Sequence, residues 1–408
     1  MYDVLIIGGG AAGFFTAINI AEKNPAAKIL ILEASSKLLA KVKVSGGGRC
    51  NVTHACFDAQ ELIEYYPRGG KSLLGAFYHF GCADTMAWFA QRGVPIVAEK
   101  DGRCFPASNT SQSIVDCFLQ QAEKCGVAIQ LQQKVTDIRL EETSKESFWE
   151  ISTTSRVFHS KNVVVCCGSS AAMWQILEKL GHRIIAPVPS LFAFNTADKN
   201  LHALSGVSVA AVEISVENMK NLQTEGAILL THKGLSGPAV LKLSAWGTRF
   251  FAEKNYHFFI KINWLPQYSF VDLQEKWQNY KQNNARKKLK NAAFSEIPQR
   301  LWLYFLHLAQ ISPEKNYADV SNKSWENLQQ ILQNNRVAVQ GKSTHKEEFV
   351  TAGGVDLKEI NLKTFESKLF PKLYFAGEVL DIDALTGGFN FQACWSAGFV
   401  VGESLELY

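Results

Sequence analysis

The sequence predicts an α/β protein built on a parallel β-sheet that the chain leaves once, for a long insert, and later re-enters. Three observations support this fold class. A glycine-rich turn follows the first apolar strand, a second apolar run ends at Gly168, and a third ends at Gly377. Strand-to-glycine turns of this kind stand at one edge of the sheet in large α/β domains, so the three segments are expected to meet.

The segment 3–33 has the pattern of a complete βαβ unit. An apolar strand runs into a glycine-rich turn from Gly8 to Gly13, an alanine-rich helix continues to Lys23, and a second apolar strand ends at Glu33. In a Rossmann-type domain such glycines allow a tight turn, a close approach of a pyrophosphate and close helix packing. The helix N-terminus favours negative charge, and Glu33 can accept hydrogen bonds from a ribose while repelling a 2′-phosphate. The pattern therefore predicts a site for FAD or NAD.

Three later segments favour FAD over NAD. The run 45–51, SGGGRCN, follows Lys41 and offers consecutive backbone N–H groups for a phosphate or a flavin carbonyl. The strand at 162–167 ends at a glycine, and the segment 373–392 brings Glu378 near a cofactor hydroxyl and a Gly-Gly turn before the last helix. The N-terminus of that helix would stabilise the negative charge of reduced flavin. A surface loop, core packing and a plain C-terminal helix are the alternative interpretations of these segments.

The residues predicted to bind FAD lie mostly in these segments. They are Gly8, Gly10, Ala11, Ala12, Gly13, Glu33, Ala34, Lys41, Ser45, Gly46, Gly47, Gly48, Arg49, Cys50, Asn51, Val135, Cys167, Gly168, Gly377, Glu378, Asp383, Gly388, Phe389, Asn390 and Phe391. The cofactor is expected to be held without a covalent bond, because no attachment motif is evident. No metal site is predicted, since the cysteines lack metal-ligand spacing.

The domain boundaries follow from changes in pattern. Residues 1–189 and 346–408 are assigned to the FAD-binding domain and residues 190–345 to the insert. Within the insert, residues 190–264 are β-rich and residues 265–345 have mainly helical spacing. The strand-like runs lie at 207–216, 226–231 and 257–263, with a turn cluster at 234–238. Further strand-like runs at 336–339 and 348–351 are predicted to return the chain to the FAD-binding domain.

Composition limits the class of protein. The chain has 408 residues, 47% of them hydrophobic, which is enough for more than one core, and its net charge of +4 does not indicate a general nucleic-acid binder. Nine cysteines without a CxxC pair indicate reduced thiols, and the adjacent Cys166 and Cys167 are interpreted as core residues rather than a redox pair. Neither an export signal nor an apolar run near the roughly 20 residues of a membrane span is evident. A soluble, cytoplasmic protein is expected.

A basic segment in the helical part of the insert leaves an RNA partner open. It combines cations with aromatic side chains, which could contact phosphates and stack on bases. A solvated helix face is the alternative interpretation. The cations are Lys281, Arg286, Lys287, Lys288, Lys290 and Arg300, and the aromatic residues are Tyr280, Phe294 and Trp302.

Several motifs together resemble the BaiN/RdsA-like family of flavoproteins, also known as the aminoacetone oxidase family. Besides the first glycine-rich turn they are SGGGRCN at 45–51, GRCFP at 102–106, THKGLSGP at 231–238, TAGGV at 351–355 and the segment 377–392. The resemblance spans nearly the whole chain. It implies an FAD-binding domain interrupted by an insert with a small β-barrel and a helical bundle. The run 166–170 departs from the family, in which a turn richer in glycine is expected.

The sequence contains no second glycine fingerprint after a strand, so no Rossmann site for NADPH is predicted beside the FAD. Electrons must therefore come either from the substrate itself or from a nicotinamide that visits the flavin without its own Rossmann domain. We expect an FAD-dependent oxidoreductase that NAD(P)H reduces transiently and that then reduces an unsaturated substrate. The family resemblance includes a uridine of ribosomal RNA, converted to dihydrouridine, among such substrates. An oxygen-dependent oxidase of a small amine such as aminoacetone is one alternative. A non-catalytic FAD-binding sensor or scaffold is another.

Few residues are candidates for acid/base chemistry. His232, in the Thr-His-Lys-Gly turn of the insert, is the predicted catalytic residue, because histidine relays protons near neutral pH. A histidine that only hydrogen-bonds its own turn is an equally consistent interpretation. Cys50 is a candidate acid or serves only through its backbone. Asp381 and Asp383 are interpreted as paired carboxylates or as part of a solvated loop.

Overall fold

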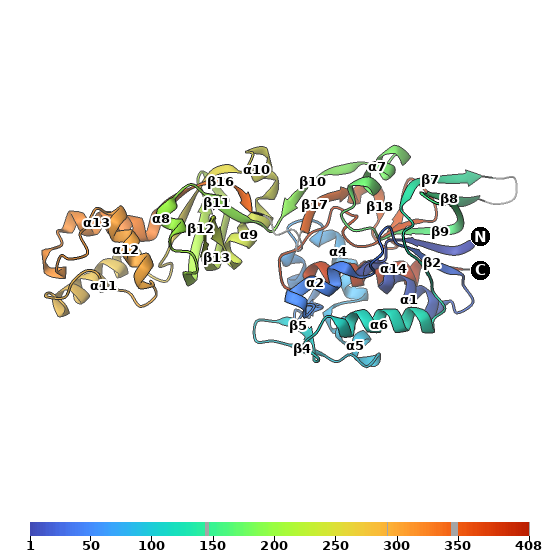
Figure 1. Cartoon of the computed structure of the whole chain (residues 1–408), viewed down its shortest axis with the longest axis horizontal. Helices are drawn as coiled ribbons and strands as arrows, with labels where there is room; N and C mark the ends of the chain where they lie inside the picture. Colours follow the sequence, from blue (N-terminus) through green and yellow to red (C-terminus); the bar gives the residue numbers. More distant parts are fainter. Residues whose placement is uncertain (143–146, 292, 344–349, 408) are drawn as a thin grey trace. The chain divides into compact units, whose positions relative to one another are not determined.

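The computed structural model describes residues 1–142, 147–291, 293–343 and 350–407. The chain divides into two compact units, Met1–Pro189 with Lys346–Tyr408, and Ser190–His345. In Figure 1 the blue and red ends of the chain lie in the same unit, whereas the green-to-orange insert forms the other. Among the described residues, no helix is both long and apolar enough to cross a membrane.

A nine-stranded sheet organises the first unit, and five neighbouring strands in it are parallel. Their order is β6-β2-β1-β9-β20, with Ile6 of β1 paired to Ile31 on one side and to Val164 on the other. The order of the strands reverses at β1, and Rossmann-type domains bind ligands beyond the carboxyl ends of the strands at such a point. The predicted α/β fold is confirmed. The bounds are β1 (Tyr2–Ile7), β2 (Ile29–Leu32), β6 (Ala128–Gln130), β9 (Val157–Val165) and β20 (Leu373–Phe375), with β7 (Val135–Glu142), β8 (Ser147–Thr153), β18 (Ile360–Asn361) and β19 (Glu366–Ser367) completing the sheet.

Small residues let the first and last helices pack closely beside this sheet. Helix α1 (Ala11–Lys23) contacts α14 (Phe389–Ser404) along much of its length. A Cβ atom at Gly398 would lie 2.6 Å from Thr16 Oγ1, and one at Gly402 would lie 3.1 Å from the Cβ of Asn19. The two ends of the chain are thereby joined in one core.

A buried polar network holds α14 against the segment between β2 and β6. The Gln392 Oε1 atom accepts hydrogen bonds from the hydroxyls of Thr53 at 2.5 Å and Thr85 at 2.9 Å, and Gln392 Nε2 donates to Ser396 Oγ at 3.0 Å. Buried polar groups that are paired in this way specify one arrangement of the elements. That segment comprises α2 (Ala40–Gly48), β3 (Thr53–His54), α3 (Ala59–Leu62), α4 (Gly70–His79), α5 (Cys82–Gln91), β4 (Ile96–Ala98), β5 (Arg103–Pro106) and α6 (Gln112–Lys124); α7 (Ala171–Leu180), β10 (Ile184–Ser190) and β17 (Val350–Val355) follow later.

The loop that precedes α14 is held by a buried ion pair. Asp383 is completely buried, and both of its carboxylate oxygens accept hydrogen bonds from the guanidinium of Arg68. The amide of Asn390 completes the loop, since its Oδ1 accepts from the backbone N–H of Ala384 at 3.0 Å and its Nδ2 donates to the Ala384 carbonyl at 3.1 Å. The interpretation of Asp383 as part of a solvated loop is therefore wrong.

The second unit contains a closed six-stranded barrel, which confirms the β-barrel implied by the family resemblance. Strand β15 (His257–Asn263) alternates exposed residues with the buried Phe258, Ile260 and Ile262, as barrel strands do. The last strand, β16 (Asn335–Ser343), pairs with β15 and β11 and so closes the barrel. The other strands are β11 (Ala193–Thr196), β12 (Ser208–Val216), β13 (Met219–Thr231) and β14 (Gly234–Ser236).

Two local predictions for the insert are wrong. Residues 336–339 belong to the barrel and do not return the chain to the first unit; of the run predicted at 348–351, residues 348 and 349 lie outside the described residues. The cluster 234–238 is a barrel strand followed directly by α9 (Pro238–Trp246), not a turn. Glycine is needed at Gly234 for close strand packing, because a Cβ there would lie 2.2 Å from the Phe194 carbonyl oxygen.

The helices that follow β15 lie at one end of the barrel (Figure 1) and share its core. Trp277 and Trp325 stack with ring centroids 4.1 Å apart, and one continuous hydrophobic cluster runs from the barrel strands to these rings. Barrel and helices therefore fold around a single apolar interior. The helices are α11 (Phe270–Asn283), α12 (Gln299–Leu308) and α13 (Asn322–Asn334), with the short α8 (Lys199–His202) and α10 (Thr248–Glu253) beside the barrel.

The aromatic residues of the basic segment belong to this interior. Phe294 is 1% exposed and Trp302 is completely buried, so the prediction that they are available for stacking on bases is wrong. Several cations are also engaged locally. Lys281, Lys288 and Arg300 donate to the backbone carbonyls of Val320, Glu314 and Ala203, and Lys290 pairs with the Glu314 carboxylate.

Removal of the cation from the buried ion pair should strongly destabilise the protein. We expect Arg68→Leu to leave the Asp383 carboxylate buried without its cation and to lower the free energy of unfolding by about 3–5 kcal/mol. Arg139→Leu is the matched control, because the Arg139–Asp137 pair is largely exposed and such pairs contribute at most about 1 kcal/mol. Urea titration followed by tryptophan fluorescence measures both losses, and equal losses would contradict the buried pair as the anchor of the loop.

Candidate FAD site

The carboxyl ends of four parallel strands bring the predicted cofactor segments together. Gly8 follows β1, Glu33 follows β2, Gly168 lies beyond β9 and Gly377 lies beyond β20. The contacts among these segments are close. A Cβ at Gly377 would lie 3.1 Å from the Cβ of Ala12, and one at Gly168 would lie 3.8 Å from the carboxylate that follows Gly377. Segments far apart in the sequence thus meet at the edge where α/β sheets bind ligands.

The three fingerprint glycines have different roles. At Gly8, φ is +118° and a Cβ would lie 2.5 Å from the Cys166 carbonyl oxygen, so glycine permits the turn beside β9. At Gly13, a Cβ would lie 2.0 Å from the Gly8 carbonyl oxygen, so glycine permits close packing of α1. At Gly10, no described atom lies within 4 Å of a Cβ, and φ is −96°, which any residue can adopt. Neither the turn nor packing explains Gly10, which instead leaves space at the N-terminus of α1.

Several helices of the first unit begin without a side-chain cap, and two of them, α1 and α14, begin in segments predicted to bind FAD. The N-cap residues are Gly10 for α1 and Gly388 for α14, and neither helix start receives a side-chain hydrogen bond from its N-cap. The first N–H groups of a helix need partners, and the helix dipole favours an anion there. These two N-termini suit a ligand that carries a pyrophosphate at one place and develops negative charge at another.

Charged side chains surround the N-terminus of α1. The carboxylate of Glu33 accepts hydrogen bonds from the backbone N–H groups of Gly9 and Ser35, both at 2.8 Å, so it is fixed at the end of β2. Lys41 Nζ and Glu378 Oε2 form an ion pair at 2.7 Å that links α2 to the segment after β20. Val135 begins β7 close by, since the N–H of Gln133 donates to the Glu33 carbonyl at 2.9 Å.

The SGGGRCN run forms an open backbone loop at the end of α2. Gly46, Gly47 and Gly48 have φ of +57°, +67° and +85°, and a Cβ at Gly47 or Gly48 would meet no described atom within 4 Å. Asn51 anchors the loop, because its Oδ1 accepts from the N–H of Cys104 at 3.2 Å. Consecutive backbone N–H groups before open space can bind an anion or a carbonyl oxygen.

Some predicted residues use their side chains for other contacts. The Arg49 guanidinium stacks over Phe105 at 3.8 Å and donates to Glu99 Oε1 at 2.5 Å, so its side chain is engaged within the protein. The Asp383 carboxylate is held by Arg68, and the Asn390 amide holds its own loop. For Arg49, Asp383 and Asn390, contact with the cofactor stays a prediction, and it would have to involve their backbone groups. Phe391 stacks on Trp395 within α14, with centroids 5.5 Å apart.

Two residues outside the predicted set, His54 and Tyr65, stack on Phe389 at the N-terminus of α14. The centroids lie 4.6 Å and 4.2 Å from that of Phe389. Burial lowers the pKa of His54, an effect that the Asp101 carbonyl, 3.2 Å from Nε2, partly offsets. Because a carbonyl oxygen only accepts, Nε2 carries the proton, and the buried Nδ1 is an acceptor without a partner among the described atoms. The position of His54 three residues after the SGGGRCN run is the sequence signal for this group.

The buried thiols are poor acids at neutral pH. Burial raises the pKa of Cys50 to about 12, although a hydrogen bond with Ser45 opposes the rise. This favours the interpretation in which Cys50 serves through its backbone. Cys166 and Cys167 are both free thiols, and burial raises the pKa of Cys167 to about 12 and that of Cys166 further. The pair is therefore unsuited to thiolate chemistry.

His232 lies on the exposed turn between β13 and β14, in the second unit. The turn is held by Thr231, whose hydroxyl oxygen accepts from the N–H groups of Lys233 at 3.4 Å and Gly234 at 3.1 Å. Within the described residues the His232 ring forms no hydrogen bond, so the interpretation that it only supports its turn is not favoured. Its catalytic role stays a prediction.

The donor groups and open spaces of the first unit fit FAD. Gly10 and the N-terminus of α1 would hold the pyrophosphate, and Glu33 would accept from a ribose. The glycine loop and the N-terminus of α14 would hold the polar edge of the flavin. The fit rests on the open space at Gly10, Gly47 and Gly48. A Cβ at any of these positions would have no described atom within 4 Å.

Gly10→Val should remove the cofactor without unfolding the protein. The valine side chain would enter the space expected for the pyrophosphate, while the backbone conformation there tolerates a Cβ. We expect the purified variant to lose its flavin absorbance and to keep the circular dichroism of the apoprotein. Gly75→Val, at an exposed position of α4 that is equally open, is the matched control and should remain yellow. A fully loaded Gly10→Val protein would remove Gly10 from the pyrophosphate site.

Curated relatives match the chain from end to end. Two are named ribosomal RNA dihydrouridine synthase: that of Haemophilus influenzae is 27% identical over 98% of both chains, and that of Escherichia coli is 28% identical over 99% of this chain and 98% of the relative. The 3-dehydro-bile acid delta(4,6)-reductase of Clostridium scindens is 24% identical over 99% of both chains.

Solved structures share the fold. The 3-ketosteroid-delta4-(5alpha)-dehydrogenase of Rhodococcus jostii has a TM-score of 0.50 at 13% identity, covering 98% of this chain and 96% of that chain. The 3-ketosteroid delta1-dehydrogenase of Sterolibacterium denitrificans has a TM-score of 0.50 at 10% identity, covering 98% of both. The family model described as HI0933-like protein Rossmann domain matches residues 2–404. The chain therefore belongs to the HI0933-like Rossmann family, a family of FAD-dependent oxidoreductases, which confirms the resemblance found in its motifs.

Proposed function

We propose that this protein reduces a carbon–carbon double bond conjugated to a carbonyl group, and that its substrate is a uridine in ribosomal RNA. The shared chemistry of its full-length relatives carries the proposal. Dihydrouridine forms when two hydrogens add across the 5,6 double bond of uracil, and a delta(4,6)-reductase also saturates ring double bonds. Two of these relatives name ribosomal RNA, which supports RNA as the substrate class.

The first unit has the features that would hold the flavin for such a reduction. When bound, reduced FAD would supply the hydride for the carbon β to the carbonyl, and the protein would have to deliver a proton to the α carbon. The uncapped N-terminus of α14 would stabilise negative charge on the flavin. His232 is the candidate proton donor, whereas the Cys50 thiol, with a pKa of about 12, would donate poorly at neutral pH.

The electron donor in this proposal is NAD(P)H. The chain carries one glycine fingerprint, at Gly8 to Gly13, and the proposed FAD occupies it. A nicotinamide would therefore approach the flavin without a Rossmann site of its own. Oxygen-dependent oxidation of a small amine is the alternative, and it would require no nicotinamide.

Anaerobic reduction followed by a chase with RNA tests the proposal. We expect NADH or NADPH, added separately, to bleach the bound flavin. Ribosomal RNA from a strain that lacks the modification should then restore the yellow colour and gain dihydrouridine, detected by mass spectrometry of its nucleosides. Gly10→Val protein is the control for flavin-independent change.

The alternatives give different results in the same experiment. A flavin that stays oxidised with both nicotinamides but bleaches with aminoacetone would replace the reductase by an amine oxidase. Bleaching by a nicotinamide without dihydrouridine in the RNA would retain the reductase and exclude the proposed substrate.

A further inference from the structure

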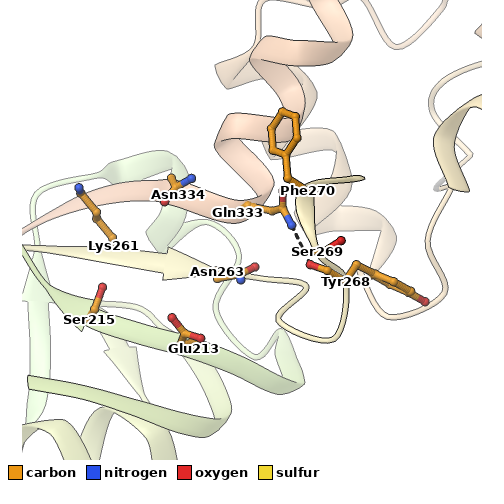
Figure 2. Close-up of a pocket in the computed structure, with 9 residues that line it drawn as sticks. All are labelled: Glu213, Ser215, Lys261, Asn263, Tyr268, Ser269, Phe270, Gln333 and Asn334. Atoms are coloured by element: carbon orange, nitrogen blue, oxygen red, sulfur yellow. Dashed lines mark hydrogen bonds between the residues drawn. The ribbon is translucent and has the colours of Figure 1, made fainter. Parts of the chain in front are cut away.

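A polar pocket in the second unit lies where the barrel meets the helices (Figure 2). Its volume is about 330 Å³, at the lower end of the range for ligand sites. The barrel side of the pocket is formed by Glu213 and Ser215 of β12 with Lys261 and Asn263 of β15. The opposite side includes Gln333 at the end of α13, whose Nε2 donates to the Tyr268 carbonyl at 2.9 Å.

The barrel side of this pocket presents polar groups that the fold does not use. Glu213 pairs in register with Asn263, and Ser215 with Lys261, so the four side chains lie in two adjacent rows. Within the described residues, the side chains of Glu213, Ser215 and Lys261 form no hydrogen bond and no ion pair. Asn263 Oδ1 accepts from the N–H of Leu265 at 3.1 Å, which leaves its Nδ2 donor for a ligand.

Folding does not explain the presence of Glu213. This residue lies directly opposite Glu225 in the register of β12 and β13. Like charges facing each other across two strands destabilise a sheet, and no ion pair with a described residue compensates Glu213. A carboxylate in such a position is accounted for if it binds a group from outside the protein.

The second unit also carries the positive charge of the chain. Residues 190–345 contain 18 lysines and arginines and 11 aspartates and glutamates, a net charge of +7. The whole chain has a net charge of +4, so the first unit has −3. A polyanion such as RNA is therefore attracted to the second unit in particular.

We propose that the pocket binds one unpaired base of the RNA substrate. Glu213 accepts hydrogen bonds from N–H groups on the edge of the base, Asn263 donates to an acceptor beside them, and Lys261 at the rim binds the adjoining phosphate. The Glu213 carboxylate would repel a phosphate, whereas it can accept a hydrogen bond from the amino group of a base. The base therefore occupies the interior of the pocket and the phosphate lies outside it. RNA-binding proteins read unpaired bases through such edges. This inference rests on the proposed function, because it takes RNA as the substrate.

Two matched variants, Glu213→Gln and Glu225→Gln, test the inference. The result that decides is whether each variant binds RNA more tightly or more weakly than the unchanged protein. Both changes remove one negative charge and both relieve the same repulsion, but only Glu213 lines the pocket. Attraction by net charge alone predicts slightly tighter RNA binding for both variants. A base contact predicts binding weakened about tenfold for Glu213→Gln, since a base contact is worth about 1–3 kcal/mol, and no weakening for Glu225→Gln.

The measurement is fluorescence anisotropy of a short fluorescein-labelled single-stranded RNA of mixed sequence, titrated with FAD-loaded full-length protein at several salt concentrations. Lys261→Ala should weaken binding and reduce the salt dependence by about one phosphate contact. Lys220→Ala, which removes an exposed lysine outside the pocket, is its control. Glu213→Gln protein that binds RNA as tightly as Glu225→Gln protein would overturn the inference. Displacement of the RNA by NADPH, together with a raised KM for NADPH in Glu213→Gln, would also overturn it.

The proposed function and the inference can fail separately. RNA binding that depends on Glu213, without formation of dihydrouridine, would exclude the proposed reaction and keep the pocket as an RNA site. Normal formation of dihydrouridine by a Glu213→Gln protein with unchanged RNA affinity would exclude the pocket and keep the reaction.

Discussion

The close approach of α1 to the ends of β1 and β9 is the constraint on which the first unit depends. A Cβ at Gly8 would lie 2.5 Å from the Cys166 carbonyl oxygen, and one at Gly13 would lie 2.0 Å from the Gly8 carbonyl oxygen. Larger residues at either position would push the helix away from the strand ends. Its N-terminus would then no longer lie beside these strand ends, and the space before Gly10 would lose its donor groups.

The second helix N-terminus of the site depends on buried polar contacts instead. The Arg68–Asp383 pair and the Asn390 amide hold the loop before α14, and the Gln392 amide holds the helix against β3 and α5. Burying these polar groups carries a large desolvation cost. Leaving one of them buried without its partner costs still more, so the contacts hold the loop and the helix in one position. The aromatic group around Phe389 is positioned by the same loop.

The two units divide the requirements of the proposed reaction. The first unit has the strand ends, helix N-termini and glycine loop that suit a flavin dinucleotide. The second has a net positive charge, an apolar interior shared by barrel and helices, and a pocket with unused polar groups. The net charge of the whole chain conceals this difference, because the −3 of the first unit offsets part of the +7 of the second.

Local patterns were sufficient to predict the first βαβ unit, the return of the chain at Gly168 and Gly377, and the barrel strand at 257–263. These features depend on periodicity, glycine chemistry and the order of the segments, which the sequence alone determines. The partners of individual side chains depend on contacts between distant segments. Arg49 turns to Glu99, Asp383 to Arg68 and His54 to Phe389, while Phe294 and Trp302 enter the core and 336–339 closes the barrel. Only the tertiary structure decides these outcomes. The charge and hydrophobicity of a residue limit the kinds of partner it can contact, but the fold determines which partner lies close enough.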